Sequence, residues 1–237
     1  MPESFTAADG DAWYRRNAAY ILENWQPETD PALRLIDLYG LAPRIVLEIG
    51  CANGYRLAHL ASRPELWRPY RAIGCDISPK AIADGRKRYP DLELHVCDAN
   101  MLPVADGLVD IVICHFVFHW LQRRMLGFCA IEVDRVLKPG GILILGDFAP
   151  DADIDVPYHH RPDVFTYKRA DTYAGLFTTT GRYREIAQLT YDHDTRVFSP
   201  FVPSERRAAE ILLCKIAERG IPVVTGLPFQ TTITWGG

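Results

Sequence analysis

Short hydrophobic runs alternate with amphipathic stretches through the middle of the chain. The runs predict buried strands at 45–49, 71–76, 92–97, 111–114 and 142–148. Apolar positions at helical spacing predict helices between them, over 55–61, 79–89 and 123–137. Strands that alternate with helices join into a parallel sheet through right-handed crossovers. The pattern therefore predicts an α/β fold with helices on both faces of the sheet.

The two ends of the chain give weaker patterns. Before the first strand, helices are expected over 11–25 and 32–39. After residue 148, we expect a long connection over 149–167, a helix over 168–178 and a strand over 184–191. The segment 206–216 has the local propensity of a helix, but a strand over 211–216 is the preferred interpretation. The long connection leaves the sheet where ligands bind, so it is expected to cover an acceptor.

The first strand runs into a glycine-containing turn and then directly into a helix. Gly50 and Gly54 let a ligand approach the backbone closely, and the helix N-terminus offers free N–H groups. The spacing is not the G-x-G-x-x-G of a pyrophosphate site. A carboxylate at Glu48 would repel phosphate and suit a cation. S-adenosylmethionine carries an ammonium, a sulfonium and no phosphate, so this cofactor is favoured.

Three acids, Glu48, Asp76 and Asp98, fall at three successive strand ends. Each alone could be a turn or capping residue. Together, beside a glycine turn, they indicate a ligand site at the carboxyl edge of the sheet. The carboxylate of Asp76 is placed to accept hydrogen bonds from two ribose hydroxyls.

Four motifs resemble the class I S-adenosylmethionine-dependent methyltransferases. The turn resembles their motif I, (D/E)-x-G-x-G-x-G, with Ala52 at the middle glycine. Residues 102–110, LPVADGLVD, are similar to the L-P-F-x-D-x-x-F-D block of the methyltransferase-11-type domain of ubiquinone and menaquinone biosynthesis enzymes. The segment 115–121, HFVFHWL, is similar to that family's V-L-x-H segment, and LKPGG at 137–141 is typical of it. The resemblance covers about 45–148.

The resemblance implies a Rossmann-like, mostly parallel, seven-stranded sheet of order 3-2-1-4-5-7-6, with the last strand antiparallel. It implies a single domain with an N-terminal helical lid (1–43), a cofactor-binding core (44–148) and a substrate-facing part (149–237). Lid contacts are expected from Trp13, Tyr14, Arg16 and Asn17, although core packing also explains their spacing.

The resemblance also assigns roles at the cofactor site. Asp98 is expected to bind the adenine amino group, and the adjacent backbone N–H to meet a ring nitrogen. The carbonyls near Cys114 and His115 are expected to receive the cofactor's ammonium. The full predicted cofactor-binding set is Tyr14, Glu48, Gly50, Cys51, Ala52, Gly54, Asp76, Ile77, Asp98, Ala99, Cys114 and His115.

A hydroxyl or ammonium acceptor must lose a proton, and histidine titrates near neutral pH. The candidate bases, in order, are His119, His159 and His115. Transfer by proximity alone is the alternative. The pair His159 and His160 could suggest a metal, but adjacent residues chelate one ion poorly, so none is expected.

Composition limits the partners. The net charge of −4 argues against nucleic acid, and no apolar run is long enough to span a membrane. The first ten residues are polar and lack a signal-peptide pattern, so a cytoplasmic protein is expected. No Cys-x-x-Cys pair occurs, so no structural zinc site is expected. A small-molecule acceptor, such as a sugar or specialised metabolite, is expected; the oligomeric state is not predicted. The alternatives are a catalytically silent cofactor-binding module and, less favoured, a nicotinamide-dependent oxidoreductase.

Overall fold

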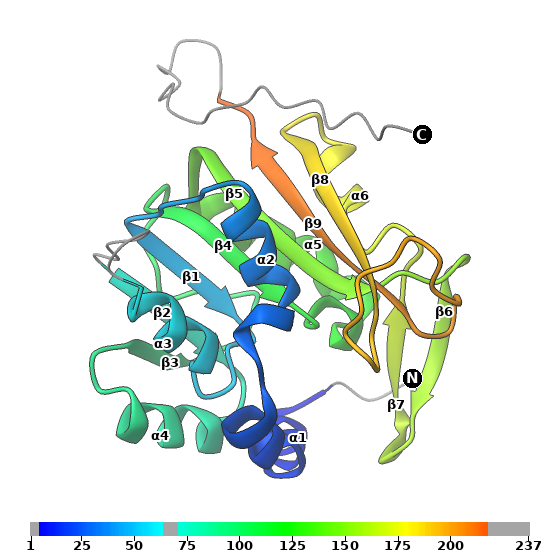
Figure 1. The fold of residues 1–237 in the computed structure, drawn as a ribbon, viewed down its shortest axis with the longest axis horizontal. Coiled ribbons are helices and arrows are strands. Elements are labelled where there is room, and N and C mark those ends of the chain that lie inside the picture. The colour runs from blue at the N-terminus through cyan, green and yellow to red at the C-terminus, as the bar shows by residue number, and fades with distance from the viewer. Residues whose placement is uncertain (1–4, 64–70, 218–237) are drawn as a thin grey trace.

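A seven-stranded sheet forms the centre of the computed structural model, which describes residues 5–63 and 71–217 (Figure 1). The strand order is β3-β2-β1-β4-β5-β9-β8, and β9 runs antiparallel to both β5 and β8. The predicted fold class and strand order are confirmed, with β8 and β9 as the predicted sixth and seventh strands. The strands are β1 Ile45–Ile49, β2 Arg71–Asp76, β3 Glu93–Val96, β4 Val109–His115, β5 Leu137–Phe148, β8 Tyr183–Asp192 and β9 Arg207–Lys215.

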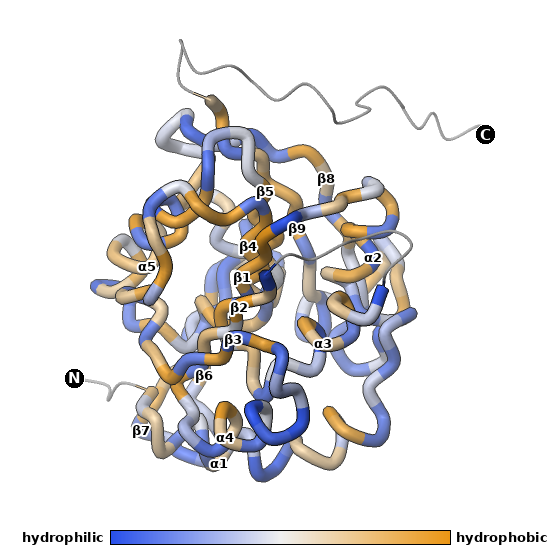
Figure 2. Tube along the Cα trace, turned by 90° about the vertical axis from the view of Figure 1, so that its left-hand side faces the viewer, coloured by the Kyte–Doolittle hydropathy of each residue, from blue (hydrophilic) through white to orange (hydrophobic). Residues whose placement is uncertain are grey.

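Helices cover both faces of the sheet (Figure 2). Helices α2 (Pro31–Leu38), α3 (Tyr55–Ala61) and α4 (Pro79–Arg88) pack on one face, and α5 (Arg123–Val136) and α6 (Gly175–Thr178) on the other. Side chains alternate between the faces along each strand. In β5, Ile142 and Ile144 join the first layer, while Leu143 and Leu145 join the second. Burial on both faces explains why these strands are hydrophobic runs rather than alternating patterns.

The first helix, α1 (Ala7–Ala19), begins four residues earlier than predicted. Thr6 caps it, and the Thr6 and Asp9 side chains each bond to the other residue's backbone N–H as a capping box. The helix continues as a π-helical turn over Tyr20–Asn24 and a 3₁₀ turn over Pro27–Thr29. The capping box was visible in the sequence; the aromatic spacing alone placed the start too late.

The predicted loop over 149–167 is wrong, because most of it forms a β-hairpin. Strand β6 (Ile154–Tyr158) pairs antiparallel with β7 (Arg161–Lys168), and together they make a separate two-stranded sheet. The connection has no Asn-Gly or Asp-Gly pair, which are the strongest short-range hairpin signals.

The predicted helix over 168–178 is also wrong, except for α6 at its end. Thr172 and Tyr173 take the left-handed conformation, with φ of +52° and +65°, which interrupts a right-handed helix. Asp171 stabilises this turn by accepting the N–H groups of Tyr173 (3.0 Å) and Gly175 (2.9 Å). The side chain of Tyr173 is buried and its hydroxyl donates to the carbonyl of Tyr167.

The ambiguous segment near the C-terminus is a strand, as preferred, although β9 begins earlier than the predicted residue 211. Pairing with β5 and β8 on both sides overrides its helical propensity. The rest of the predicted substrate-facing part, 218–237, lies outside the described residues.

Candidate active site

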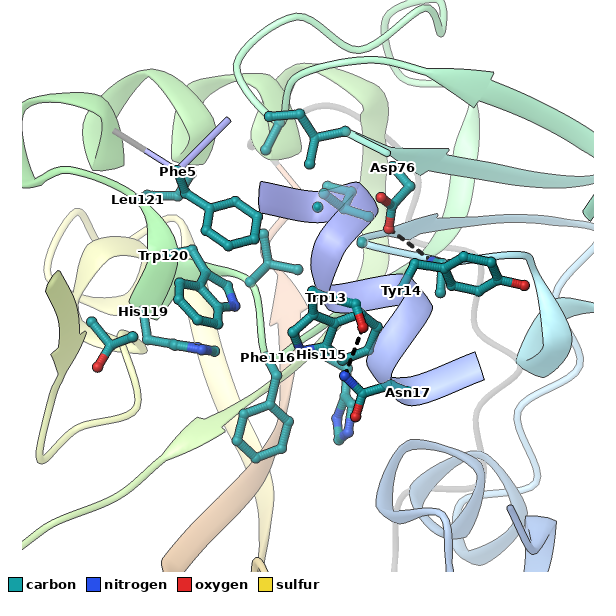
Figure 3. A pocket seen from close by; sticks show the side chains of 18 of the residues that line it. Phe5, Trp13, Tyr14, Asn17, Asp76, His115, Phe116, His119, Trp120 and Leu121 are labelled. Carbon is teal, nitrogen blue, oxygen red and sulfur yellow. Dashed lines mark hydrogen bonds between the residues drawn. The ribbon is translucent and has the colours of Figure 1, made fainter. Parts of the chain in front are cut away.

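A cavity of about 1060 Å³ lies beyond the carboxyl ends of β1, β2 and β4. Helix α1, the turn Phe118–Trp120, the β6–β7 hairpin and the β8–β9 connection complete its walls. Ligand pockets commonly measure about 300–1,000 Å³. The cavity therefore has room for a cofactor and a second molecule. Figure 3 shows Asp76 and Tyr14 on one side of it and His119 and Trp120 on the other.

The turn after β1 brings the backbone to the cavity wall. Gly50 has a φ of +73°, and a Cβ there would meet Cγ2 of Val117 at 2.3 Å. Gly54, with a φ of +81°, is the N-cap of α3. Ala52 also takes a positive φ, of +51°, which costs a residue other than glycine about 1–2 kcal/mol. The middle position of motif I is thus left-handed here, and a glycine would fit it without strain.

Asp76 lines the cavity at the end of β2. Its carboxylate accepts the N–H groups of Ala52 and Ser78, both at 2.8 Å. Burial raises the pKa of Asp76 to about 6, although these two hydrogen bonds oppose the shift. Each carboxylate oxygen still has a lone pair for another donor. The arrangement fits a ribose diol, because backbone groups fix the carboxylate before a ligand arrives.

The segment after β3 lies beside Asp76, since the N–H of Cys97 donates to the Asp76 carbonyl at 3.0 Å. Asp98 and Ala99 follow and line the cavity, as does Ile77. The contacts predicted for them with adenine stay predictions.

Glu48 has a partner that the sequence did not indicate. It is fully buried and forms an ion pair with Arg56, which also binds Asp30 at 3.0 Å. Burial raises the pKa of Glu48, while Arg56 opposes the shift. The described residues that line the cavity include Arg56 but not Glu48. The cation beside Glu48 is therefore an arginine of this chain, and the cofactor contact expected of Glu48 stays a prediction.

Three other predicted cofactor residues also fall outside the described lining: Cys51, Gly54 and Cys114. Cys51 and Cys114 are buried in the two layers of the core. Their side chains pack the sheet, so any cofactor contact from them would come from the backbone, as was predicted for Cys114.

His115, at the end of β4, belongs to a row across three strands. It lies opposite Gly146 on β5, which lies opposite Glu210 on β9. Because Gly146 has no side chain, the buried Glu210 carboxylate reaches across it to Nδ1 of His115 at 2.8 Å. A Cβ on Gly146 would sit 1.9 Å from Oε2 of Glu210. The Glu210 carboxylate thus fixes the orientation of the imidazole ring. Nε2 is then the ring nitrogen that can accept a hydrogen bond or a proton.

His119 forms a second pair of this kind. It lies in the 3₁₀ turn Phe118–Trp120, and its Nδ1 is 2.9 Å from Oδ1 of Asp147 on β5. The backbone N–H of His119 also donates to Asp147, at 3.1 Å. Both side chains are buried, and His119 lines the cavity. An ionised carboxylate on Nδ1 leaves Nε2 free to accept a proton.

His159 and His160 form the tip of the hairpin at the rim of the cavity. Both are exposed, and their ring centroids are 3.8 Å apart. Slight loss of hydration and the positive charges of Arg16 and His159 lower the pKa of His160. The structure brings His159 to the same cavity as His115 and His119, but at its open side.

Helix α1 is anchored directly to α4 and to its N-cap residue. The hydroxyl of Tyr14 donates to Asp84 at 2.6 Å, and Asp11 accepts Ser78 Oγ at 2.6 Å. All four predicted lid residues line the cavity: Trp13, Tyr14, Arg16 and Asn17. Figure 3 shows Asn17 donating to the Trp13 carbonyl, at 2.8 Å.

Sequence reasoning missed a group of residues on the far side of the cavity from Asp76. They come from the ends of β4 and β5, from β7 and from the β8–β9 connection, so no local motif joins them. We call them the acceptor-end group: Phe116, Phe148, Lys168, His193 and Arg196. Phe116 has a φ of +55°, a strained conformation that is common at functional sites.

Comparison with known proteins shows what the core of the sheet, residues 47–145, is similar to. A family model described as a methyltransferase domain matches residues 47–145. A demethylmenaquinone methyltransferase of Beutenbergia cavernae is 32% identical over 48% of this chain and 45% of its own. A probable S-adenosylmethionine-dependent methyltransferase of Mycobacterium tuberculosis is 33% identical over 66% of this chain and 56% of its own. The chain thus spans about half the length of the curated relatives it matches.

Solved structures share the fold. The 1,6-didemethyltoxoflavin-N1-methyltransferase of Burkholderia thailandensis, solved with 1,6-didemethyltoxoflavin and S-adenosylhomocysteine, aligns with a TM-score of 0.67. It is 14% identical over 89% of this chain and 87% of its own. Within the described residues, no helix has the length and apolar character needed to cross a bilayer. Residues 47–145 thus match a methyltransferase domain and are similar to S-adenosylmethionine-dependent methyltransferases, with S-adenosylmethionine as the cofactor.

Proposed function

We propose that this chain transfers a methyl group to a hydroxyl or amine of a small molecule, such as a sugar or specialised metabolite. The proposal rests on His119. This buried histidine is oriented by Asp147 and lines a cavity that is larger than one ligand needs. Two of the relatives' names support a small acceptor: they refer to demethylmenaquinone and to 1,6-didemethyltoxoflavin. Because these two acceptors differ chemically, the names do not identify the acceptor of this chain.

The cofactor end of the cavity consists of Gly50, Asp76 and Asp98. Gly50 leaves space that a side chain would fill, and Asp76 is a fixed acceptor for two hydroxyls. S-adenosylmethionine supplies an electrophilic methyl group on a sulfonium. The chain's own contribution at this end is orientation, which can lower a displacement barrier substantially.

His119 is the proposed base. Its Nε2 takes the proton from the acceptor's hydroxyl or ammonium, and the Asp147 carboxylate stabilises the imidazolium that forms. His115, oriented by Glu210, is a second imidazole in the same cavity and is partly buried. His159 is less suited, because it is exposed at the hairpin tip and has no carboxylate partner among the described residues.

Helix α1 is proposed as the lid. Its four predicted lid residues line the cavity, and its bonds to Ser78 and Asp84 attach it to α4 next to Asp76. A cofactor bound under α1 would be shielded from water, which strengthens electrostatic interactions in the site.

The proposal is tested with a panel of hydroxyl- and amine-bearing small molecules, with S-adenosylhomocysteine formation as the readout. Turnover of one or more acceptors is expected, and it should fall sharply in His119→Ala. Binding of S-adenosylhomocysteine without turnover of any acceptor would support the silent binding module instead. The nicotinamide-dependent alternative is set aside, because the core is a methyltransferase domain. A cytoplasmic location and the lack of a nucleic-acid partner remain predictions from composition.

A further inference from the structure

The acidic side chains that line the cavity gather at one of its ends, whereas its cations, which also include Arg16, Arg56 and Arg124, are spread more widely. The acids among the described lining residues are Asp76 and Asp98, both at the cofactor end. The acceptor-end group contributes two cations, Lys168 on β7 and Arg196 in the β8–β9 connection, and no carboxylate.

Lys168 is half-buried and has no ion-pair partner within 4.0 Å among residues 5–63 and 71–217. Its Nζ lies 3.8 Å from the centroid of the Phe148 ring. The acids that act on it from neighbouring elements are Asp147 and Asp194. Each of these is already bonded to a histidine, Asp147 to His119 and Asp194 to His193.

Arg196 also lacks a carboxylate partner within the described part of the chain. Its guanidinium carbon lies 5.9 Å from the Phe116 ring, and its backbone has a φ of +60°. Other partly or fully buried arginines differ: Arg56 binds Asp30, and Arg169 binds Asp155.

The His193 ring neighbours both of the aromatic rings that the two cations contact. Its ring centroid is 5.0 Å from that of Phe148, the ring that Lys168 contacts. It is 5.1 Å from that of Phe116, the ring that Arg196 contacts. Burial lowers the pKa of His193, and Arg196 and Lys168 lower it further against the effect of Asp194. Both cations therefore contact one cluster of rings, formed by Phe116, Phe148 and His193.

A partly desolvated cation without a counter-charge is unfavourable, and a contact with an aromatic ring offsets only part of that cost. We propose that Lys168 and Arg196 together bind an anionic group of the acceptor, a carboxylate or a phosphate, and so select an anionic small molecule. This inference rests on the proposed function, since it concerns the acceptor of the same site. Lys168 and Arg196 act as specificity residues, and the base remains His119.

The test is calorimetric titration of the protein saturated with S-adenosylhomocysteine, with inorganic phosphate in one series and malonate in another, at low ionic strength. We expect at least one anion to bind one-to-one. Lys168→Met and Arg196→Met should each weaken that binding tenfold or more, and Lys168→Arg should retain it. Lys87→Met, which removes an exposed lysine of α4, is the matched control and should change nothing. The anion that binds better identifies the group as phosphate or carboxylate.

The inference is overturned if neither anion binds to the saturated protein, or if Lys168→Met and Arg196→Met bind the anion as the unaltered chain does. The dissociation constant of S-adenosylhomocysteine should stay the same in all variants, which separates anion binding from cofactor binding. Failure of S-adenosylhomocysteine itself to bind would count against the proposed function, and titration of the unliganded protein would then still test the cation pair.

Discussion

The two ends of the cavity are built in different ways. The cofactor end comes from three strands that are successive in the sequence: Gly50 follows β1, Asp76 ends β2 and Asp98 follows β3. The acceptor end comes from side chains far apart in the sequence, as in the pairs His115–Glu210 and His119–Asp147. Local motifs therefore determine the first end, and tertiary pairing determines the second. Variants that separate cofactor affinity from turnover test this division.

The largest effect is expected at the acceptor end. His119→Ala removes the proposed base, and general bases contribute about 10²–10⁴-fold to rate. Turnover should fall by that order, while S-adenosylhomocysteine affinity stays within about twofold. Steady-state kinetics and calorimetry on the same preparations measure both. His95→Ala, on β3 outside the cavity lining, is the control. Full activity in His119→Ala would leave proximity alone as the mechanism.

The next effect is expected at the cofactor end. Asp76→Ala removes the fixed carboxylate and its charge-assisted hydrogen bonds, worth about 1.5–3 kcal/mol. S-adenosylhomocysteine should bind roughly 10- to 150-fold more weakly by calorimetry. Asp91→Ala removes an exposed acid elsewhere and should leave the affinity unchanged. An unaltered affinity in Asp76→Ala would show that this carboxylate does not hold the ribose.

A third variant tests the long-range row that orients His115. Gly146→Ala places a Cβ on the Glu210 carboxylate, and overpacking of this kind costs about 1–3 kcal/mol of unfolding free energy. Urea denaturation measures the loss. Gly127→Ala on α5 is a matched control, since its Cβ would meet nothing within 4 Å and alanine favours a helix. Equal stability of the two variants would contradict the Gly146 contact.

The smallest effect is a pH dependence of cofactor affinity. The pKa of Asp76 is raised to about 6, and the ionised form is the one that accepts two hydroxyls. Affinity should therefore fall as the pH drops through 6, by about tenfold between pH 7 and pH 5. Titrations with S-adenosylhomocysteine at several pH values measure it. Asp76→Asn should lose this dependence, and a variant that kept it would assign the titration to another group.

Sequence reasoning succeeded where a pattern is local. The bounds of β1, β2 and α3 agree with the predicted ones, because each is a short apolar run or amphipathic stretch limited by a turn residue. The hairpin β6–β7 was missed because its pairing is set by contacts across the turn rather than by a turn signature. The partner of Glu48 was missed for the same reason, since Arg56 reaches it from the next helix. The helix predicted over 168–178 includes Lys168, so the sequence does not foresee its place beside Phe148.

We infer that one cavity has a cofactor end at Asp76 and a catalytic end at His119. The most direct test is the dissociation constant of S-adenosylhomocysteine, measured by calorimetry for the unaltered chain, Asp76→Ala and His119→Ala. We expect tight binding to the unaltered chain, a large loss in Asp76→Ala and no significant change in His119→Ala. Absence of binding to the unaltered chain, or equal losses in the two variants, would contradict it.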